Sequence, residues 1–281
     1  EILIIDSSAC SILPALKEIE RSTHTQIRVL EGNNYYPGYA RNFGAKNAEG
    51  EIICFLDAKT IPTENWLSDG LLLLSEQGND MVVGKFQSRE SSFFGKIVKA
   101  ATFGNLPHSC LPGTITYKKI FLASGGFHPS TRAGEDIDWL YRMKHLGFTI
   151  KKPQDVNLIY SGLPTSLLGV IKKWYLYSME NAKVNILIGQ KSIYFFLLLI
   201  FFLYLSYRWN YISTGGAWDR SPYFIPHLNT ILWSIMGISY ITFRSLILPL
   251  KRKEKITFLL PINFIYIGAV SFIIDLVKIP G

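Results

Sequence analysis

Three long apolar segments in the last third of the 281-residue chain restrict its fold most strongly. They cover residues 193–207, 223–250 and 256–277, and a helix needs about 20 apolar residues to cross a bilayer. Arg244 interrupts the second segment and Asp275 the third. We expect all three to be transmembrane helices of an integral membrane protein. The first is short, so an interfacial or re-entrant helix is its alternative.

The positive charges predict how these segments are oriented. Lys183 and Lys191 precede the first segment, a basic run at 251–255 joins the second to the third, and the loop 208–222 is nearly balanced. Because positive loops stay inside, we expect the N-terminal part and the basic run to face the cytoplasm. The net charge of +8 therefore indicates membrane lipids as partners. No nucleic-acid-binding signature occurs, so nucleic acid is not an expected partner.

The first two thirds of the chain alternate between strand and helix patterns. This alternation predicts an α/β domain with a doubly wound, mostly parallel sheet, in which ligands bind beyond the carboxyl ends of the strands. Asp6 and Asp57 stand at two such ends, although an aspartate that starts a loop or caps a helix is the alternative for each. The predicted strands are 2–5, 26–30, 51–56 and 80–86, and the predicted helices are 13–21, 39–48 and 66–77.

Several short motifs follow one another in a specific order. They are Asp6-Ser-Ser, Gly38-Tyr-Ala-Arg-Asn-Phe-Gly-Ala45, Phe55-Leu-Asp-Ala58, Gly125-Gly-Phe127 and Gly134-Glu-Asp136. In this order the sequence resembles family 2 glycosyltransferases of the GT-A fold from Glu1 to about Ile159. The resemblance implies a Rossmann-like domain that binds a nucleotide-sugar donor. It also implies that the chain begins after the family's first strand.

The resemblance assigns roles to residues of the first motifs. Asp6 would accept hydrogen bonds from the uracil or ribose, because a carboxylate offers only acceptors. Arg41 would place its guanidinium on phosphate or nucleotide oxygens, with a surface salt bridge as the alternative. Asn42 and Gly113 are further implied substrate contacts, Gly113 from the segment 113–117 on the acceptor side. Asp57 matches the first acid of the family's Asp-x-Asp motif, so a divalent cation, Mg²⁺ or Mn²⁺, is the implied cofactor.

One position departs from the family pattern. Lys59 stands where the second acid of the Asp-x-Asp motif belongs, and a protonated lysine does not ligate a cation. Either Asp57 alone holds the metal more weakly, or Lys59 itself offsets the charge of the donor diphosphate. A lysine that only points to solvent is the third possibility.

The acidic motif supplies the predicted catalytic group. By resemblance, Glu135 and Asp136 lie under the acceptor site, and Asp136 is our choice for the general base, with Asp138 as the runner-up. Acids in the first turn of a helix also complement its macrodipole, and both roles are compatible. Trp139 shares a helical face with Asp136, so it either stacks against a sugar or acceptor or belongs to the core.

The stretch before the membrane helices gives information on processivity. Processive family members carry a Gln-x-x-Arg-Trp motif there, whereas this chain has only Lys172-Lys173-Trp174, which argues against a polymer synthase. The basic and aromatic run 172–177 is instead typical of an interfacial helix on anionic headgroups.

These observations divide the chain into a GT-A domain at 1–165, an interfacial amphipathic helix at 166–192 and a membrane region at 193–281. The implied function is an inverting glycosyltransferase that moves a sugar from a nucleotide-diphosphate donor to a lipid-linked or glycan acceptor, in cell-envelope polysaccharide synthesis. A non-catalytic membrane scaffold with the same fold is the alternative. A nucleotidyltransferase is disfavoured, because no Gly-rich basic phosphate loop follows the first strand.

Overall fold

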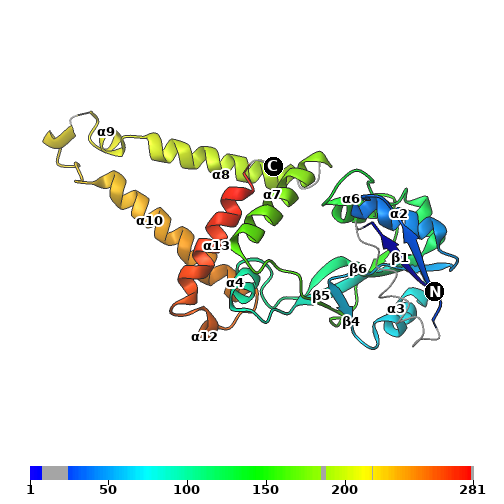
Figure 1. Cartoon of the computed structure of the whole chain (residues 1–281). Coiled ribbons are helices and arrows are strands. Elements are labelled where there is room, and N and C mark those ends of the chain that lie inside the picture. The colour runs from blue at the N-terminus through cyan, green and yellow to red at the C-terminus, as the bar shows by residue number, and fades with distance from the viewer. Residues whose placement is uncertain (8–24, 185–187, 217, 280–281) are drawn as a thin grey trace.

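The computed structural model describes residues 1–7, 25–184, 188–216 and 218–279. An α/β part occupies one end of an elongated molecule, and a group of helices occupies the other (Figure 1). The elements are β1 (Ile2–Asp6), β2 (Ile27–Glu31), α2 (Pro37–Asn47), β3 (Ile52–Cys54), β4 (Thr60–Pro62), α3 (Trp66–Ser75), β5 (Met81–Ser88), α4 (Phe93–Thr102), β6 (His108–Tyr117), α5 (Lys118–Ala123), α6 (Glu135–His145), β7 (Ile150–Lys151), β8 (Leu158–Tyr160), α7 (Leu167–Lys183), α8 (Ile188–Ser206), α9 (Trp209–Ser213), η1 (Trp218–Arg220), α10 (Leu228–Thr242), η2 (Phe243–Ile247), α11 (Leu248–Lys251), α12 (Ile256–Leu259) and α13 (Asn263–Val277).

The strands form two sheets. β1 and β2 pair in parallel, and the larger sheet has the order β3-β6-β5-β8-β4, with β7 also on β5. The α/β class is confirmed, but the pairing is mixed rather than mostly parallel: β5–β7 and β5–β8 are parallel, whereas β3–β6, β5–β6 and β4–β8 are antiparallel. Two of the antiparallel pairings involve β6, which lies between β3 and β5, and the third joins β4 to β8. The predicted strands did not include β4, β6 or β8.

The other predicted elements of the α/β part are confirmed with small shifts at their ends. The predicted helix at 39–48 is α2, which begins earlier because Pro37 suits the first turn of a helix. The predicted helix at 66–77 is α3, and the strands at 2–5, 26–30, 51–56 and 80–86 are β1, β2, β3 and β5. The helix predicted at 13–21 lies outside the described residues.

An aromatic core holds β3 and α6 in place beneath the strand ends. Phe55, directly after β3, packs on Phe121, Phe127 and Trp139 with ring centroids 5.2–6.2 Å away. Trp139 of α6 is fully buried. Only Leu56 separates Phe55 from Asp57, so this packing also fixes the loop that carries Asp57. The core thereby places the start of α6 beside the end of β3.

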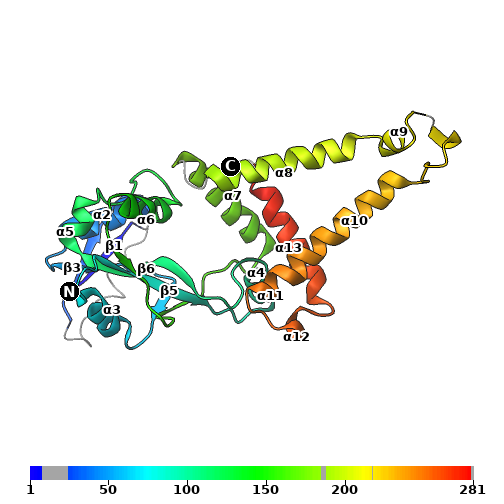
Figure 2. The same cartoon turned by 180° about the vertical axis from the view of Figure 1, so that it is seen from behind.

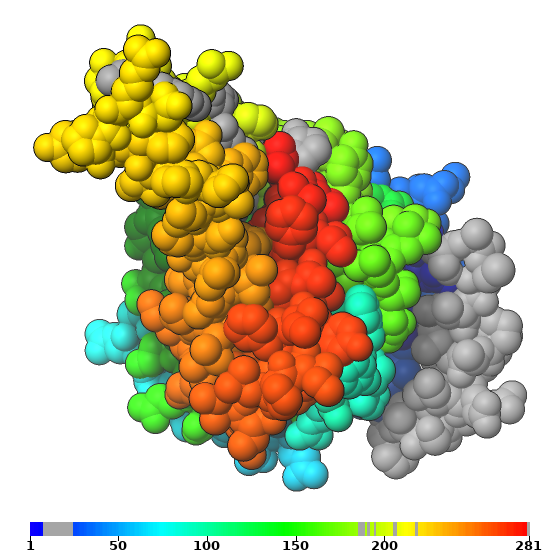
Figure 3. Space-filling view, turned by 90° about the vertical axis from the view of Figure 1, so that its left-hand side faces the viewer, coloured from blue at the N-terminus to red at the C-terminus, as the bar shows by residue number. Residues whose placement is uncertain are grey.

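A second core joins the two parts of the molecule. Ile97 and Val98 of α4, Val170 and Trp174 of α7, and Ile267 of α13 are all buried in it. α4 belongs to the α/β chain segment, yet it lies with the C-terminal helices and away from α2 and α6 (Figures 1 and 2). Figure 3 shows α13 between α10 and α7 on this face. The last helix is therefore packed on the protein along one side.

Of the described residues, one helical stretch is long and apolar enough to cross a membrane, Leu228–Lys251. It comprises α10, a π-helical turn and α11, and it matches the second predicted segment. The first and third predicted segments are helical as well, but their apolar helices in the described residues, Phe195–Tyr204 and Asn263–Val277, are shorter. α8 and α10 diverge from the rest of the molecule and meet at α9, far from the α/β part (Figure 1).

The charged residues that interrupt the apolar segments are paired with each other. Arg244 Nε lies 2.8 Å from Asp275 Oδ2, and the Tyr240 hydroxyl donates to the same oxygen at 2.8 Å. This contact ties the π-helical turn η2 to α13. Each charge therefore has its partner on the neighbouring helix, as charges in an apolar environment require.

The basic run 251–255 docks on the α/β part. Arg252 Nη1 donates to the Ala101 carbonyl at 2.8 Å, and Lys99 lies 3.4 Å from Glu254. Asn105 donates to the carbonyl of Lys253 and to Glu254. The run is therefore held against α4 and the residues that follow it, while its position relative to a membrane stays a prediction.

Candidate functional site

Arg41 joins the predicted site residues of three elements. It projects from α2, donates through Nη1 to Glu135 Oε1 at 2.7 Å and through Nη2 to Asp57 Oδ1 at 2.8 Å. Its guanidinium also lies 5.6 Å from the centre of the Phe127 ring. The side chains of Arg41 and Glu135 are 16% and 6% exposed, whereas that of Asp57 is 39% exposed. Asp57 is therefore the member of this triad that solvent and a ligand reach.

Burial raises the pKa values of the two acids at the start of α6, Glu135 and Asp136. Burial raises the pKa of Asp136, and the charge of Asp57 adds to this while Arg41 and the backbone oppose it. Burial and the charge of Asp136 likewise raise the pKa of Glu135, against the effect of Arg41. Asp57 and Asp136 are thus close enough to interact electrostatically. A carboxylate whose pKa is raised towards neutrality is a better proton acceptor at physiological pH.

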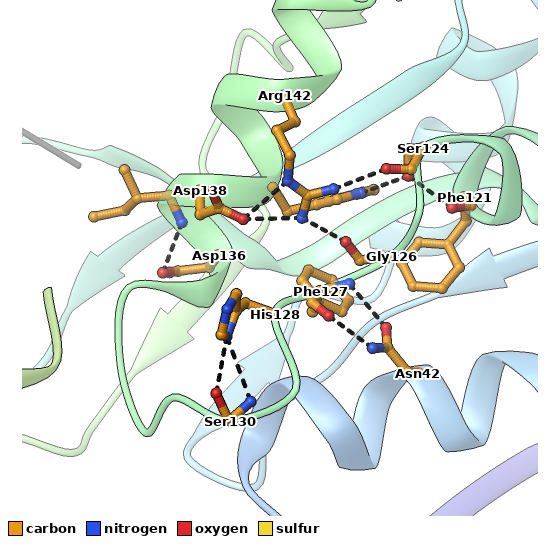
Figure 4. Close-up of polar contacts among 12 residues, drawn as sticks. Asn42, Phe121, Ser124, Gly126, Phe127, His128, Ser130, Asp136, Asp138 and Arg142 are labelled. Carbon is orange, nitrogen blue, oxygen red and sulfur yellow. Dashed lines mark hydrogen bonds and ion pairs between the residues drawn. The ribbon is translucent and has the colours of Figure 1, made fainter. Parts of the chain in front are cut away.

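The loop before α6 is held from both sides, as Figure 4 shows. The Asn42 carboxamide donates to the Phe127 carbonyl and accepts from the Phe127 amide, both at 2.8 Å. Arg142 donates to the carbonyls of Ser124 and Gly126. These bonds fix the Gly-Gly-Phe loop against α2 and α6. Asn42 therefore positions this loop, and its contact with a substrate stays a prediction.

Figure 4 also shows the ion pair between Asp138 and Arg142. Arg142 Nη2 lies 2.9 Å from Asp138 Oδ2. The carboxylate of Asp138 is committed to this pair, which leaves Asp136 as the acid that faces Asp57.

Two expected substrate contacts lie in the interior instead. Trp139 is fully buried and donates through Nε1 to the Ser124 hydroxyl at 2.8 Å, so it belongs to the core and offers no face to a sugar. Gly113 is buried as well; its amide donates to the Phe55 carbonyl and its carbonyl accepts from Trp66 Nε1. Its φ of +81° suits glycine, and an added Cβ would lie 2.5 Å from Leu158. It shapes the strand beside Phe55.

Asp6 is buried at the end of β1, where its carbonyl accepts from the Gly32 amide. β1 packs against α2, the helix that carries Arg41. The structure thus brings Arg41, Asp57, Glu135 and Asp136 together, and it places Asp6 on the strand beneath the same helix.

A cavity of about 580 Å³ opens beside Asp57. Lys59 lines it from the loop after β3, and α7 closes it with Lys173 and Tyr177. Burial and the charges of Asp136, Glu135 and Asp57 raise the pKa of Tyr177, which shows that α7 faces the acidic cluster. Sequence reasoning did not assign Tyr160, Lys173 or Tyr177 to the site. Lys173 and Tyr177 belong to the basic and aromatic run 172–177, which we attributed to lipid headgroups, and Tyr160 lies outside that run.

The described residues contain no group of three or more His, Cys, Asp or Glu side chains that could hold a metal ion. Asp57 contributes one carboxylate, and its Oδ1 already accepts from Arg41. Mg²⁺ commonly binds through one or two carboxylates together with substrate phosphates and water. The donor set therefore fits a cation that arrives with a phosphorylated substrate.

The N-terminal part of the chain is similar to known glycosyltransferases. Residues 1–129 match the family model of glycosyl transferase family 2. Glycosyltransferase AglE of Haloferax volcanii is 24% identical over 172 residues, which cover 56% of this chain and 55% of AglE. The matched region thus spans about half the length of that relative.

Two solved structures are similar at low sequence identity. The mannosyltransferase PcManGT from Pyrobaculum calidifontis, in complex with GDP-Man and Mn²⁺, matches with a TM-score of 0.47 and 17% identity over 65% of this chain and 54% of that chain. S. aureus TarS 1–349, in complex with UDP-GlcNAc, matches with a TM-score of 0.42 and 16% identity over 99% of this chain and 81% of that chain.

Proposed function

We propose that the chain is an inverting glycosyltransferase, because residues 1–129 match the family model of glycosyl transferase family 2. It moves a hexose-type sugar from a nucleotide-diphosphate donor to a lipid-linked or glycan acceptor. The observation that carries this proposal is the cluster in which Arg41 joins Asp57 and Glu135 with Asp136 close by, next to a cavity that Asp57 lines.

In the proposed reaction, Asp136 accepts the proton of the acceptor hydroxyl. The acceptor oxygen then forms a bond to the anomeric carbon, while the bond from that carbon to the diphosphate oxygen breaks on the opposite face. The sugar is transferred with inversion, and the nucleoside diphosphate leaves with the bonding electrons. Arg41 holds Asp57 and Glu135 in place through its two hydrogen bonds, so the cleft keeps its shape when a substrate arrives.

Mg²⁺ or Mn²⁺ would be held by Asp57 together with the donor's phosphate oxygens, where it would neutralise the departing diphosphate. Lys59 lines the same cavity and is not ion-paired with a carboxylate among the described residues. It is placed to supply positive charge that the family's second acid would otherwise bring through the metal.

The membrane part of the proposal is supported by the helix Leu228–Lys251. With the α/β part at the cytoplasmic face of a bilayer, the cleft lies where lipid-linked acceptors are concentrated. The docking of the basic run 251–255 on α4 supports the same orientation, with this run also at the cytoplasmic face.

A screen of donors tests the proposed function directly. The full-length protein in nanodiscs is incubated with a panel of UDP-, GDP- and TDP-linked sugars, and released nucleoside diphosphate is measured with and without lipid extract as the acceptor source. We expect turnover of one donor class, stimulated by the extract. Failure to bind or turn over any nucleotide sugar would refute the proposal.

A chelator experiment separates the roles of Asp57 and Lys59. If Lys59 offsets the diphosphate charge, wild-type transfer persists in excess EDTA, and Lys59→Ala lowers this residual rate about a hundredfold. Initial rates are measured with and without EDTA for both proteins, with Lys152→Ala, an exposed lysine outside the cavity, as the matched control. A strict requirement of the wild type for Mn²⁺ would contradict the role of Lys59.

A further inference from the structure

The cavity beside Asp57 is basic. Among its described lining residues, Lys59, Lys172 and Lys173 are the cations and Asp57 is the one carboxylate. Asp57 is already hydrogen-bonded to Arg41. The cavity wall therefore carries positive charge that no lining side chain offsets.

Lys172 and Lys173 both line this cavity, but Lys173 is the more buried of the two. Lys172 is exposed, whereas Lys173 is partly buried, and its ammonium lies 5.5–5.8 Å from the ring centres of Tyr160, Trp174 and Tyr177. It donates to the Tyr160 hydroxyl at 3.0 Å and the Gly162 carbonyl at 3.3 Å. An ammonium has three N–H donors, so these two contacts leave one for a ligand.

The surroundings of Lys173 do not compensate its charge. Its partners in the described structure are neutral, and burial, followed by the charge of Lys59, lowers the pKa of Lys173 to about 8, although Glu90 opposes the shift. A buried cation held by neutral groups and aromatic rings gains most from a ligand that supplies negative charge. Phosphate brings up to two charges and several acceptor oxygens, which matches a pair of lysines.

We propose that Lys59 and Lys173 form a phosphate-binding site on the α7 side of the cleft, which takes the phosphate group of a lipid-linked acceptor or the diphosphate of the donor. This inference rests on the proposed function for the identity of those two substrates, and on the cavity alone for the phosphate chemistry. α7 thereby acts as a wall of the substrate site as well as a link to the helices.

Binding measurements on the full-length protein in nanodiscs test the site without requiring turnover. The ligands are a short-chain prenyl phosphate with its uncharged prenol, and UDP and GDP with their nucleosides, all with Mg²⁺ present. We expect Lys173→Met to weaken binding of at least one phosphorylated ligand about tenfold to a hundredfold, as loss of a charged hydrogen bond predicts. Weaker binding of the prenyl phosphate would assign the site to the acceptor phosphate, and weaker binding of UDP or GDP would assign it to the donor diphosphate.

The unphosphorylated ligands are one control, and Lys173→Met should bind them with the same affinity as the wild type does. Lys152→Ala is the second control, and it should bind every ligand with wild-type affinity. Lys173→Arg keeps the charge, so it should retain binding even if Lys173→Met folds poorly. Equal binding of phosphorylated and unphosphorylated ligands by the wild type, or unchanged binding by Lys173→Met in both arms, would overturn the inference.

The pH dependence gives a readout that a merely structural lysine would not move. The second pKa of a prenyl phosphate lies near 6, so its charge is nearly constant above about pH 7. Because Lys173 binds as the cation, wild-type affinity should be highest between about pH 7 and pH 8 and fall as the pH rises through 8. The pKa values of Tyr160 and Tyr177 are raised, mainly by burial, so these hydroxyls stay protonated in that range. In Lys173→Arg this decline should disappear; a decline equal to that of the wild type would assign it to Lys59 or Lys172 and overturn the role of Lys173.

The two proposals fail separately. If Lys173-dependent phosphate binding occurs but no donor is turned over, the glycosyltransferase proposal fails and the phosphate site stands. If transfer occurs and phosphate binding ignores Lys173, the site fails alone.

Discussion

Substituting Asp136 with asparagine should lower the transfer rate about a hundredfold to ten-thousandfold, because asparagine accepts no proton from the acceptor hydroxyl. The fall of the transfer rate at acidic pH, the acid limb of the pH profile, is also predicted. Burial raises the pKa of Asp136, so the wild-type rate falls as the pH drops through this raised value, and the limb should be absent in Asp136→Asn. Rates are measured under single-turnover conditions across the pH range in which the fold is stable.

The stability of the same variant distinguishes a lost base from a lost fold. A carboxyl whose folded-state pKa is raised costs stability once the pH exceeds its unfolded-state pKa, and the cost is complete above the folded-state pKa. Asparagine removes this cost and keeps the oxygen that accepts from the Ile137 amide. Thermal unfolding at neutral pH should therefore be unchanged or later. Asp155→Asn, at an exposed aspartate, is the matched control. A rate within threefold of the wild type would exclude Asp136 as the base.

Substituting Arg41 with alanine should reduce the free energy of unfolding by about 3–5 kcal/mol, since removing one partner of a buried ion pair leaves an uncompensated charge. The uncompensated charge would be that of Glu135. Its side chain is 6% exposed, and its Oε2 has no hydrogen-bond partner among the described residues. Asp57, at 39% exposed, can be hydrated instead and contributes less. Chemical denaturation of the detergent-solubilised protein measures the loss.

A double variant checks the cause. Glu135→Gln in the Arg41→Ala background removes the stranded charge, so it should restore part of the lost stability, whereas Glu135→Gln alone should be mildly destabilising. If Arg41→Ala costs less than about 1 kcal/mol, or if the second substitution restores nothing, the ion pair does not support the site as described.

The positions of the acids were predictable because they follow local rules. Asp57 comes at the end of a strand and Asp136 in the first turn of a helix, and both positions are visible in the residue pattern before any contact is known. Both acids lie near Arg41 because the end of β3 and the start of α6 lie side by side. The partner of Arg41 in the interior, Glu135, was predicted as a site residue but not as the buried half of an ion pair.

The parts that were missed depend on packing between distant segments. Lys172 and Lys173 differ by about 100° around α7, so the sequence alone does not say which of them is the more buried. The contact of Trp174 and Val170 with α13 makes that choice. Trp139 was left open between core and ligand for the same reason, since only the surrounding rings of Phe55, Phe121 and Phe127 assign it to the core.

The placement of α4 has a consequence for how the protein works as a whole. α4 belongs to the α/β chain segment but shares a core with α7 and α13. The α/β part is therefore packed directly on the C-terminal helices. If the α/β part lies at a bilayer as proposed, this packing would set its height and tilt above the membrane. A lipid-linked acceptor would then have to match that fixed distance, so the protein would select acceptors by chain length or headgroup size.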